Sequence, residues 1–128
     1  MIVYQNNLCE ISPCQLSGFC VGWKSPLDGE TLHKILKNSY RIVVALDDQT
    51  TQVVGFVNSL SDDVYFAFIP MLEVLPAYQN KGIGKELLKR LFVELSSIAN
   101  IDVLCDKELQ SYYEKFGMMK SYGMVFRK

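Results

Sequence analysis

The sequence predicts an α/β (α+β) domain built on a mixed, mostly antiparallel sheet of about six to seven strands. Two observations lead to this fold class. The middle of the chain holds three apolar, β-branched segments joined by short polar turns, a pattern typical of an antiparallel meander. After the meander come a strand, an amphipathic helix and another strand, and this order calls for a parallel, right-handed crossover within one sheet.

Length and composition narrow the class of protein. The 128 residues predict a single domain over 1–128, large enough to fold without disulfides. A formal charge of −1 disfavours a nucleic-acid partner. The N-terminus has no export signal and the longest uncharged apolar run, 64–72, is too short to cross a membrane. We therefore expect a cytoplasmic protein with no membrane partner.

The cysteines and the single histidine do not suggest a metal site. The four cysteines contain no C-x-x-C pair, so we predict reduced thiols and no metal. His33 lies beside the apolar face of a predicted helix, where we expect a surface or packing role.

The first forty residues predict one strand and two helices. The apolar segment 2–5 favours a strand. Ser12 followed by Pro13 is a helix-start signal, and the apolar residues after it predict a short helix that ends near Gly22. A second helix is predicted over 30–37 from its helical spacing of leucine and isoleucine.

The meander comprises predicted strands over 41–46, 52–60 and 64–69. Pro70 cannot donate a hydrogen bond to a neighbouring strand. The strand that spans 64–75 must therefore be interrupted or bulged at this proline.

The clearest helix begins near Ile83, and its apolar stripe continues at spacings of three and four to Ile98. Beyond it we expect, in order, a strand over 101–105, a helix over 108–116 that stops at Gly117, and one or two further strands within 118–127.

The segment QNKGIG, residues 79–84, lies where the interrupted strand gives way to this helix. The first turn of a helix has unpaired N–H groups and a partial positive charge, which together favour an anion. Gly82 and Gly84 would let a phosphate approach the main chain, and Lys81 and Lys85 add positive charge. The alternative is a tight loop with close helix packing.

Two familiar phosphate-binding patterns do not fit this loop. A Walker A loop needs wider glycine spacing and Ser or Thr where this chain has Glu86. A dinucleotide fingerprint needs a third glycine at the position of Leu87.

The pattern Q-x-x-G-x-G, with the lead-in LEVLPAYQNKGIGKELL and the downstream YYEKFGM at 112–118, resembles the GCN5-related N-acetyltransferases (GNAT). The resemblance extends from about 41 to 118 and includes the order of helices and strands. It implies helices on both faces of the sheet. It also implies that strand four, 64–75, and strand five, 101–105, splay apart to admit acetyl-CoA as cosubstrate.

The resemblance implies which residues bind acetyl-CoA. The main chain of Leu72 and Val74 would pair with the pantetheine arm, a form of β-augmentation. The diphosphate would lie on the amides of Gln79, Asn80, Lys81, Gly82, Ile83, Gly84 and Lys85. Asp106 occupies a position where the family commonly has asparagine, so the hydrogen-bond acceptor oxygen is kept and the N–H hydrogen-bond donor is lost.

The resemblance also implies the chemistry, which is direct attack of an amine on the thioester. Tyr113 occupies the position of the family's tyrosine and would stabilise the leaving thiolate by a hydrogen bond. Glu73 is the candidate base, although strand alternation sends its side chain opposite to its neighbours and relatives carry a carboxylate earlier on the strand. Cys105 ends strand five near the expected thioester and is interpreted as a small buried hydrophobe.

We therefore predict an acetyl-CoA-dependent N-acetyltransferase that modifies a primary amine of a small molecule or peptide. The alternative is a CoA-binding sensor or interaction module with little or no turnover. The loop around Trp23 falls where the family builds its acceptor pocket, and the sequence leaves the acceptor and a homodimer open.

Overall fold

The computed structural model describes residues 1–128 and contains one six-stranded sheet. Its strands are β1 (Ile2–Gln5), β2 (Arg41–Asp47), β3 (Val53–Ser61), β4 (Phe66–Ile69), β5 (Leu72–Val74) and β6 (Asn100–Val103). The α-helices are α1 (Gly29–Lys37), α2 (Ile83–Glu94) and α3 (Gln110–Glu114). Single 3-10 turns are η1 (Pro13–Gln15), η2 (Pro76–Tyr78) and η3 (Lys107–Leu109).

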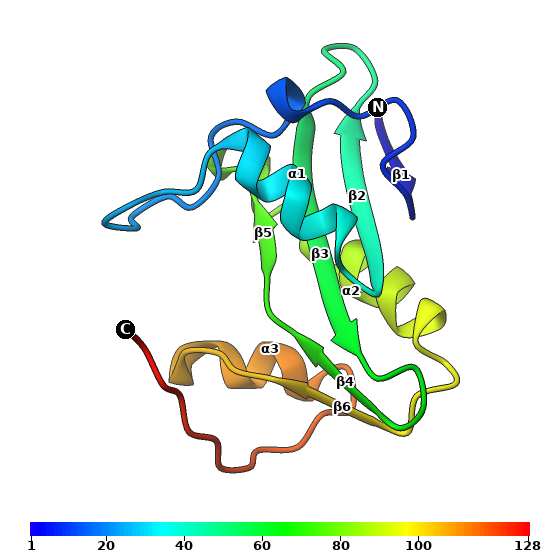
Figure 1. The fold of residues 1–128 in the computed structure, drawn as a ribbon, viewed down its shortest axis with the longest axis vertical. Helices are drawn as coiled ribbons and strands as arrows, with labels where there is room; N and C mark the ends of the chain where they lie inside the picture. Colours follow the sequence, from blue (N-terminus) through cyan, green and yellow to red (C-terminus); the bar gives the residue numbers. More distant parts are fainter.

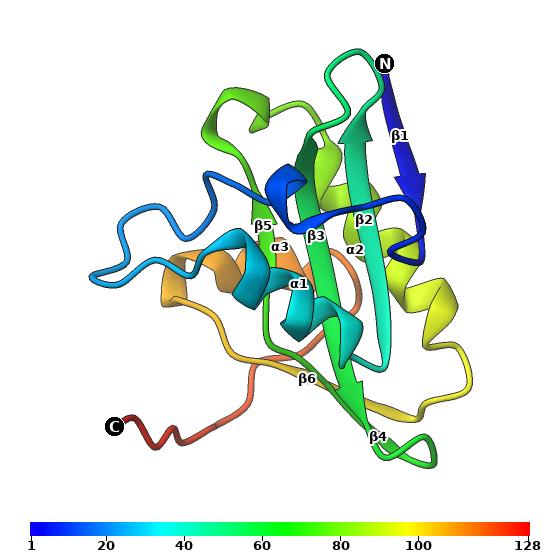
Figure 2. The ribbon, with the colours of Figure 1, turned by 45° about the horizontal axis from the view of Figure 1, so that its top comes forward.

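The sheet lies between α1 on one face and α2 on the other (Figure 1 and Figure 2). The strand order is β1-β2-β3-β4-β6, with β5 paired to β3. Every pair is antiparallel except β4 and β6, which are parallel because α2 carries the chain between them. The predicted fold class, including helices on both faces, is confirmed.

Helix α2 packs on the sheet through the predicted stripe. Ile83, Leu87, Leu88 and Leu91 are buried because their spacing places them on one helical face. The helix ends at Glu94, before the stripe does, and the remaining apolar residues are buried in the following turn. No helix of this protein has the length and apolar character needed to cross a membrane.

The predicted interruption at Pro70 divides strand four into β4 and β5. β4 pairs with β6, whereas β5 pairs with β3 alone. The strands before and after the crossover helix, β4 and β6, are therefore paired as far as Ile69 and Val103, and the chain segments separate beyond these residues. This is the splay that the resemblance implied.

The helix predicted from Ser12 is shorter than expected. The start signal does work, because the Ser12 N–H donates to Gln15 Oε1 at 2.8 Å as in a capping box, but only the turn η1 follows. Gly18 takes a left-handed φ of 87°, and Cys20 and Gly22 also have positive φ. These angles end the helix, since consecutive right-handed residues are required to continue it. The segment instead contributes its apolar side chains to the core.

The strands predicted within 118–127 do not form. The chain beyond α3 runs without helix or strand, and it leaves the main body as an extended segment (Figure 1). Its apolar residues suggested strands, but no neighbouring strand in the same chain receives them. The last helix is also shorter than predicted, since η3 precedes α3 and the helix stops three residues before Gly117.

Candidate active site

The loop between β5 and α2 presents a run of main-chain amides without protein partners. No N–H group from Asn80 to Lys85 donates a hydrogen bond within the chain, and the next amide, that of Glu86, donates to the Gly82 carbonyl at 3.1 Å. Asn80 and Gly82 have left-handed φ angles of 61° and 83°. Such turns direct successive N–H groups into an anion-binding concavity. We call the amides from Asn80 to Lys85 the amide cradle.

The charges around the amide cradle also suit an anion. Lys81 and Lys85 are exposed beside it, with the Lys81 ammonium 5.6 Å from the centre of the Tyr78 ring. The neighbouring carboxylate, Glu86, is paired with Arg90 at 2.8 Å, and this pairing lowers its pKa. The helix end and two lysines therefore contribute positive charge that no adjacent free carboxylate opposes.

The two glycines of the loop serve different purposes. Gly82 is the N-cap of α2 and has a left-handed φ of 83°, which glycine adopts more readily than other residues. Crowding does not require a glycine there, because a Cβ would meet nothing within 4 Å. A Cβ on Gly84 would lie 3.3 Å from the Tyr112 hydroxyl oxygen and 3.7 Å from a Val74 methyl carbon. Close packing therefore explains Gly84, and backbone conformation explains Gly82.

One edge of β5 is free, and it continues into the amide cradle. The Leu75 N–H bonds to Val54 and the Asn58 N–H bonds to Met71, so alternation turns the main-chain groups of Leu72 and Val74 away from β3. β6 does not pair on that side. Of these outward groups, the Val74 carbonyl accepts from Gln79 Nε2 at 3.0 Å, and the others have no partner.

A buried asparagine, which the sequence analysis did not identify, fixes the break between β4 and β5. Asn58 is 1% exposed, and its side-chain oxygen accepts from the Met71 N–H at 3.1 Å while its amide donates to Ser39 Oγ at 3.0 Å. Because a buried amide is costly without partners, these bonds hold the chain at the position where the splay begins. The available signal was a polar Asn-Ser pair in an otherwise apolar strand.

Tyr113 lies in the core between Tyr112 and Cys105. Its ring centre is 5.3 Å from that of Tyr112, which in turn packs against Gly84. Burial, with smaller contributions from Cys105 and Tyr112, raises the pKa of Tyr113 to about 12. The Tyr113 hydroxyl has no protein partner, and since no fully buried side-chain oxygen lacks a partner, it reaches solvent. It is a protonated, uncommitted hydrogen-bond donor.

Glu73 lies on the other side of β5 from Leu72 and Val74, as alternation predicts. Its Oε2 accepts from the Cys20 N–H at 2.9 Å, which connects the strand to the N-terminal segment. Burial, and to a lesser extent the Glu73 carboxylate, raises the pKa of the Cys20 thiol. Only one carboxylate oxygen is used, so the other can face a ligand.

Asp106 and Cys105 follow β6 on the far side of the splay. Asp106 is the exposed N-cap of η3, and its carboxylate accepts no hydrogen bond. Burial raises the pKa of the Cys105 thiol, and the neighbouring Asp106 adds to this effect. Cys105 is therefore a protonated thiol, but it is half-buried rather than buried as predicted.

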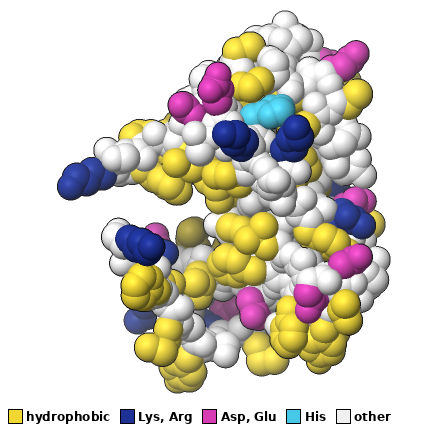
Figure 3. Space-filling view, viewed as in Figure 1, with side chains coloured by type: hydrophobic (Ala, Val, Ile, Leu, Met, Phe, Trp, Pro, Cys, Tyr) yellow, Lys and Arg dark blue, Asp and Glu magenta, His cyan; other side chains and the backbone are white.

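The remaining candidates are His33, the possible metal ligands and Trp23. His33 Nε2 is 3.0 Å from the carbonyl of Ile11, so it has the packing role predicted for it. No three metal-ligating side chains come together. Trp23 is 49% exposed in the protruding segment 20–28. Figure 3 shows a notch beneath this segment, with hydrophobic side chains on its walls.

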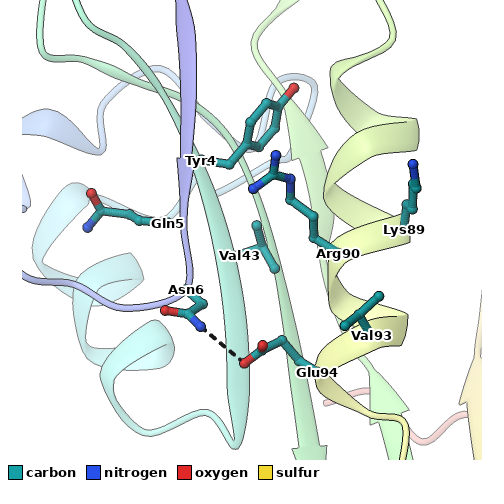
Figure 4. Close-up of a pocket in the computed structure, with 8 residues that line it drawn as sticks. All are labelled: Tyr4, Gln5, Asn6, Val43, Lys89, Arg90, Val93 and Glu94. Atoms are coloured by element: carbon teal, nitrogen blue, oxygen red, sulfur yellow. Dashed lines mark hydrogen bonds between the residues drawn. The ribbon is translucent and has the colours of Figure 1, made fainter.

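A cavity of about 370 Å³ lies beside the C-terminal half of α2, away from the amide cradle (Figure 4). Two of its charged groups are already paired. Arg90 is bonded to Glu86 and stacks over the Tyr4 ring at 4.6 Å, and Glu94 accepts from Asn6 at 3.3 Å. The amide cradle and the free edge of β5, by contrast, offer adjoining unpartnered main-chain groups, so we take the splay as the candidate active site.

Comparisons with known proteins show the family to which this chain belongs. Residues 7–118 match the acetyltransferase (GNAT) family. An uncharacterised N-acetyltransferase, ycf52, of Porphyra purpurea is 31% identical over 92% of this chain and 71% of its own length. A histone acetyltransferase, TAP1, of Glycine max is 30% identical over 84% of this chain, which spans about half (52%) of that relative.

A solved structure shares nearly the whole arrangement. The crystal structure of an acetyltransferase candidate from Deinococcus radiodurans superposes with a TM-score of 0.95 at 38% identity, covering 99% of this chain and 88% of that one. Members of this family use acetyl-CoA as the acetyl donor. The chain belongs to the acetyltransferase (GNAT) family and is an acyltransferase.

Proposed function

We propose that this protein transfers an acetyl group directly from acetyl-CoA to a primary amine of a small molecule or peptide. The observation that carries the proposal is the continuity of two sets of unpartnered main-chain groups. The amide cradle and the free edge of β5 adjoin, and together they match an anionic diphosphate followed by an amide-bearing arm.

The residues present fit acetyl-CoA, which supplies the acetyl group as a thioester. The amides from Asn80 to Lys85 would hold the diphosphate, with the two lysines of the loop adding charge. The main-chain groups of Leu72 and the N–H of Val74 would pair with the arm. Gln79 differs from its neighbours, and its predicted role as an amide donor to the diphosphate is not kept, because its N–H already donates to the Pro76 carbonyl at 3.3 Å. Its side chain joins the loop to the strand through the Val74 carbonyl.

The amine must lose a proton before it can attack. An alkylamine with a lysine-like pKa near 10.4 is neutral in only about one molecule in 2,500 at pH 7. Glu73 is the proposed group for this step, because it faces the segment 20–28 and has one oxygen free. It would hold the ammonium and accept its proton, directly or through water.

Tyr113 would stabilise the departing sulfur. A thiol has a pKa near 8.5, so full proton transfer from a phenol with a pKa of about 12 would be uphill by roughly 5 kcal/mol. The hydroxyl therefore serves as a hydrogen-bond donor to the thiolate and keeps its proton. Such a bond strengthens as negative charge develops, which is what catalysis requires.

The acceptor would enter from the notch beneath segment 20–28. The relative named a histone acetyltransferase supports a peptide lysine as one candidate, and the near-neutral charge of this chain does not restrict the choice to an acidic or basic molecule. Peptide and small-molecule amines therefore both belong in the test.

Release of free CoA in the presence of a panel of amines tests the proposal. The panel contains a polyamine, free amino acids, an aminoglycoside and a lysine peptide. We expect amine-dependent release with at least one of them. Tight acetyl-CoA binding by calorimetry with no release from any amine would instead support the sensor function, and an absence of binding would contradict the proposed site itself.

A further inference from the structure

The cavity beside the C-terminal half of α2, which we call the α2 cavity, combines apolar and charged residues (Figure 4). Its apolar surface comes from the buried Val43, the half-buried Tyr4 ring and Val93, which is 68% exposed. Its volume of about 370 Å³ is at the low end for ligand pockets, which range from about 300 to 1,000 Å³. A small molecule with an apolar part therefore suits this cavity.

Arg90 is held in place and still has hydrogen-bond donors to offer. Its Nε donates to Glu86 Oε1 at 2.8 Å, and its guanidinium carbon lies 4.6 Å from the centre of the Tyr4 ring. Neither terminal nitrogen, Nη1 or Nη2, donates a hydrogen bond within the chain. Because the two contacts already fix the guanidinium, these nitrogens can bind a carboxylate in the α2 cavity with little further loss of side-chain freedom.

Glu94 supplies the opposite charge one helical turn further along α2. Its Oε1 accepts a hydrogen bond from the Asn6 side-chain amide at 3.3 Å, which is a neutral partner. Lys37 and Arg41 line an adjacent cavity that also includes Glu94, but neither forms an ion pair with it. The negative charge of this half-buried carboxylate is therefore not neutralised by an ion pair within the chain, and its second oxygen is unused.

The spacing of these two groups fits a zwitterion. Arg90 and Glu94 are four residues apart on α2, and a helix rises about 1.5 Å per residue, so their Cα atoms are separated by about 6 Å along the axis. Both side chains reach from α2 toward β1 and β2 (Figure 4). A carboxylate on Arg90 and an ammonium on Glu94 can therefore belong to one small molecule, whose apolar part would lie on Val43 and Val93.

From these features we infer that the α2 cavity is a second ligand site and that its ligand is a free α-amino acid with an apolar side chain. The terminal nitrogens of Arg90 bind the carboxylate of the amino acid, and Glu94 binds its ammonium group. The site is separate from the proposed active site, because its lining residues belong neither to the amide cradle nor to the segment 20–28. The inference does not depend on the acetyl acceptor or on the catalytic roles proposed above.

An amide-detected NMR titration of the full chain, without acetyl-CoA, tests the inference with four probes. Leucine has both charges and an apolar side chain, leucinamide lacks the carboxylate, 4-methylpentanoate lacks the ammonium, and glycine lacks the side chain. We expect leucine to shift the amides of β1, Val43 and residues 89–94 with a dissociation constant of about 1 mM. Each of the other probes should bind at least about tenfold more weakly, since each loses one of the three contacts.

Two variants assign the contacts within the α2 cavity. Glu94→Gln can still accept from Asn6 through its carbonyl oxygen, so it should weaken leucine binding about tenfold and leave the binding of 4-methylpentanoate unchanged. Arg90→Gln should weaken the binding of both probes, because both present a carboxylate. Glu30→Gln, at an exposed carboxylate in the first turn of α1, is the matched control and should bind leucine as the wild type does.

Three results would overturn the inference. No shift with leucine at about ten times the expected dissociation constant would mean that the α2 cavity does not bind an amino acid. Shifts gathered around the segment 20–28 and Glu73 would mean that leucine binds only as an acetyl acceptor. Equal binding of leucine and either singly charged probe would mean that the cavity does not recognise a zwitterion.

Discussion

The two sides of the splay are built in different ways. On the proposed cofactor side, the main chain of β5 and the amide cradle would provide the binding groups, and side chains matter mainly where they are absent, at Gly82 and Gly84. On the proposed acceptor side, the segment 20–28 and Glu73 would provide side chains from distant parts of the sequence. Recognition by main chain leaves a glycine pattern in the sequence, whereas recognition by side chains leaves no fixed spacing.

A matched pair of glycine substitutions tests this contrast most severely. Gly82 and Gly22 have φ angles of 83° and 84°, and a Cβ at either would meet nothing within 4 Å. Valine at either position should therefore strain the backbone similarly and lower the melting temperature by a similar amount. Only Gly82→Val should disturb the amide cradle. Losing two charge-assisted bonds of about 1.5 kcal/mol each would weaken acetyl-CoA binding about 100-fold.

Isothermal calorimetry with acetyl-CoA measures this difference, and Gly22→Val is the control. Equal affinities for the two variants would show that the loop is a structural turn rather than a binding site.

Tyr113→Phe tests the acetyl-transfer step, in which the bound cofactor and the acceptor react. Removing a hydrogen bond of about 2 kcal/mol to the developing thiolate should lower kcat about 30-fold and leave acetyl-CoA binding nearly unchanged. Tyr112→Phe removes the same atom one residue away and should retain kcat. Steady-state kinetics separates the two variants, and an unchanged kcat for Tyr113→Phe would exclude the proposed role.

The raised pKa of Tyr113 gives a second readout for the same variant. A phenol whose pKa rises from 10.0 to about 12 on folding keeps its proton in the native state. Its contribution to stability is therefore complete below pH 10 and is lost as the pH rises from 10 to 12. Thermal unfolding of Tyr113→Phe should depend less on pH in that window than unfolding of the wild type.

Glu73→Gln tests the acceptor side alone. Glutamine can still accept from the Cys20 N–H through its carbonyl, but it cannot pair with an ammonium or take its proton. We expect kcat/KM for the amine to fall at least about tenfold, with acetyl-CoA affinity unchanged. Glu30→Gln, an exposed carboxylate in the first turn of α1, is the control. A loss of acetyl-CoA affinity would show that Glu73 acts in cofactor binding rather than in binding the acceptor.

Asp106→Asn should have the smallest effect of these substitutions, and it should strengthen acetyl-CoA binding rather than weaken it. The change removes a negative charge beside the proposed path of an anionic ligand and restores an N–H donor. A gain of about 0.6 kcal/mol, or roughly threefold in acetyl-CoA affinity, is expected at low salt. Calorimetry at two salt concentrations checks it, because a gain that persists unchanged in high salt would not be electrostatic.

Local signals predicted the parts of the fold that depend on local chemistry. The period of the meander, the proline at 70 and the stripe of α2 each act within a few residues, and the structure has all three. The prediction failed where the outcome depends on distant contacts. Ser12 starts a helix, but positive φ angles at Gly18 and beyond end it, and residues 118–127 have strand character but no strand beside them.

The same distinction applies to the site. The amide cradle follows from its glycines and the start of α2, so its position was predictable from the sequence. Asn58 was missed because its function lies in bonds to Met71 and Ser39, which only the folded chain brings to it. The bond from Cys20 to Glu73 spans 53 residues and has no signature along the sequence.

The central claim is that main-chain amides bind the diphosphate of acetyl-CoA, and an amide-detected NMR titration with CoA tests it most directly. The account predicts that the largest downfield shifts occur for the amides from Asn80 to Lys85, followed by those of Leu72 and Val74, because a charged acceptor polarises the N–H groups it binds. Unchanged amides in that loop, with shifts gathered instead around the cavity at the C-terminal half of α2, would contradict it.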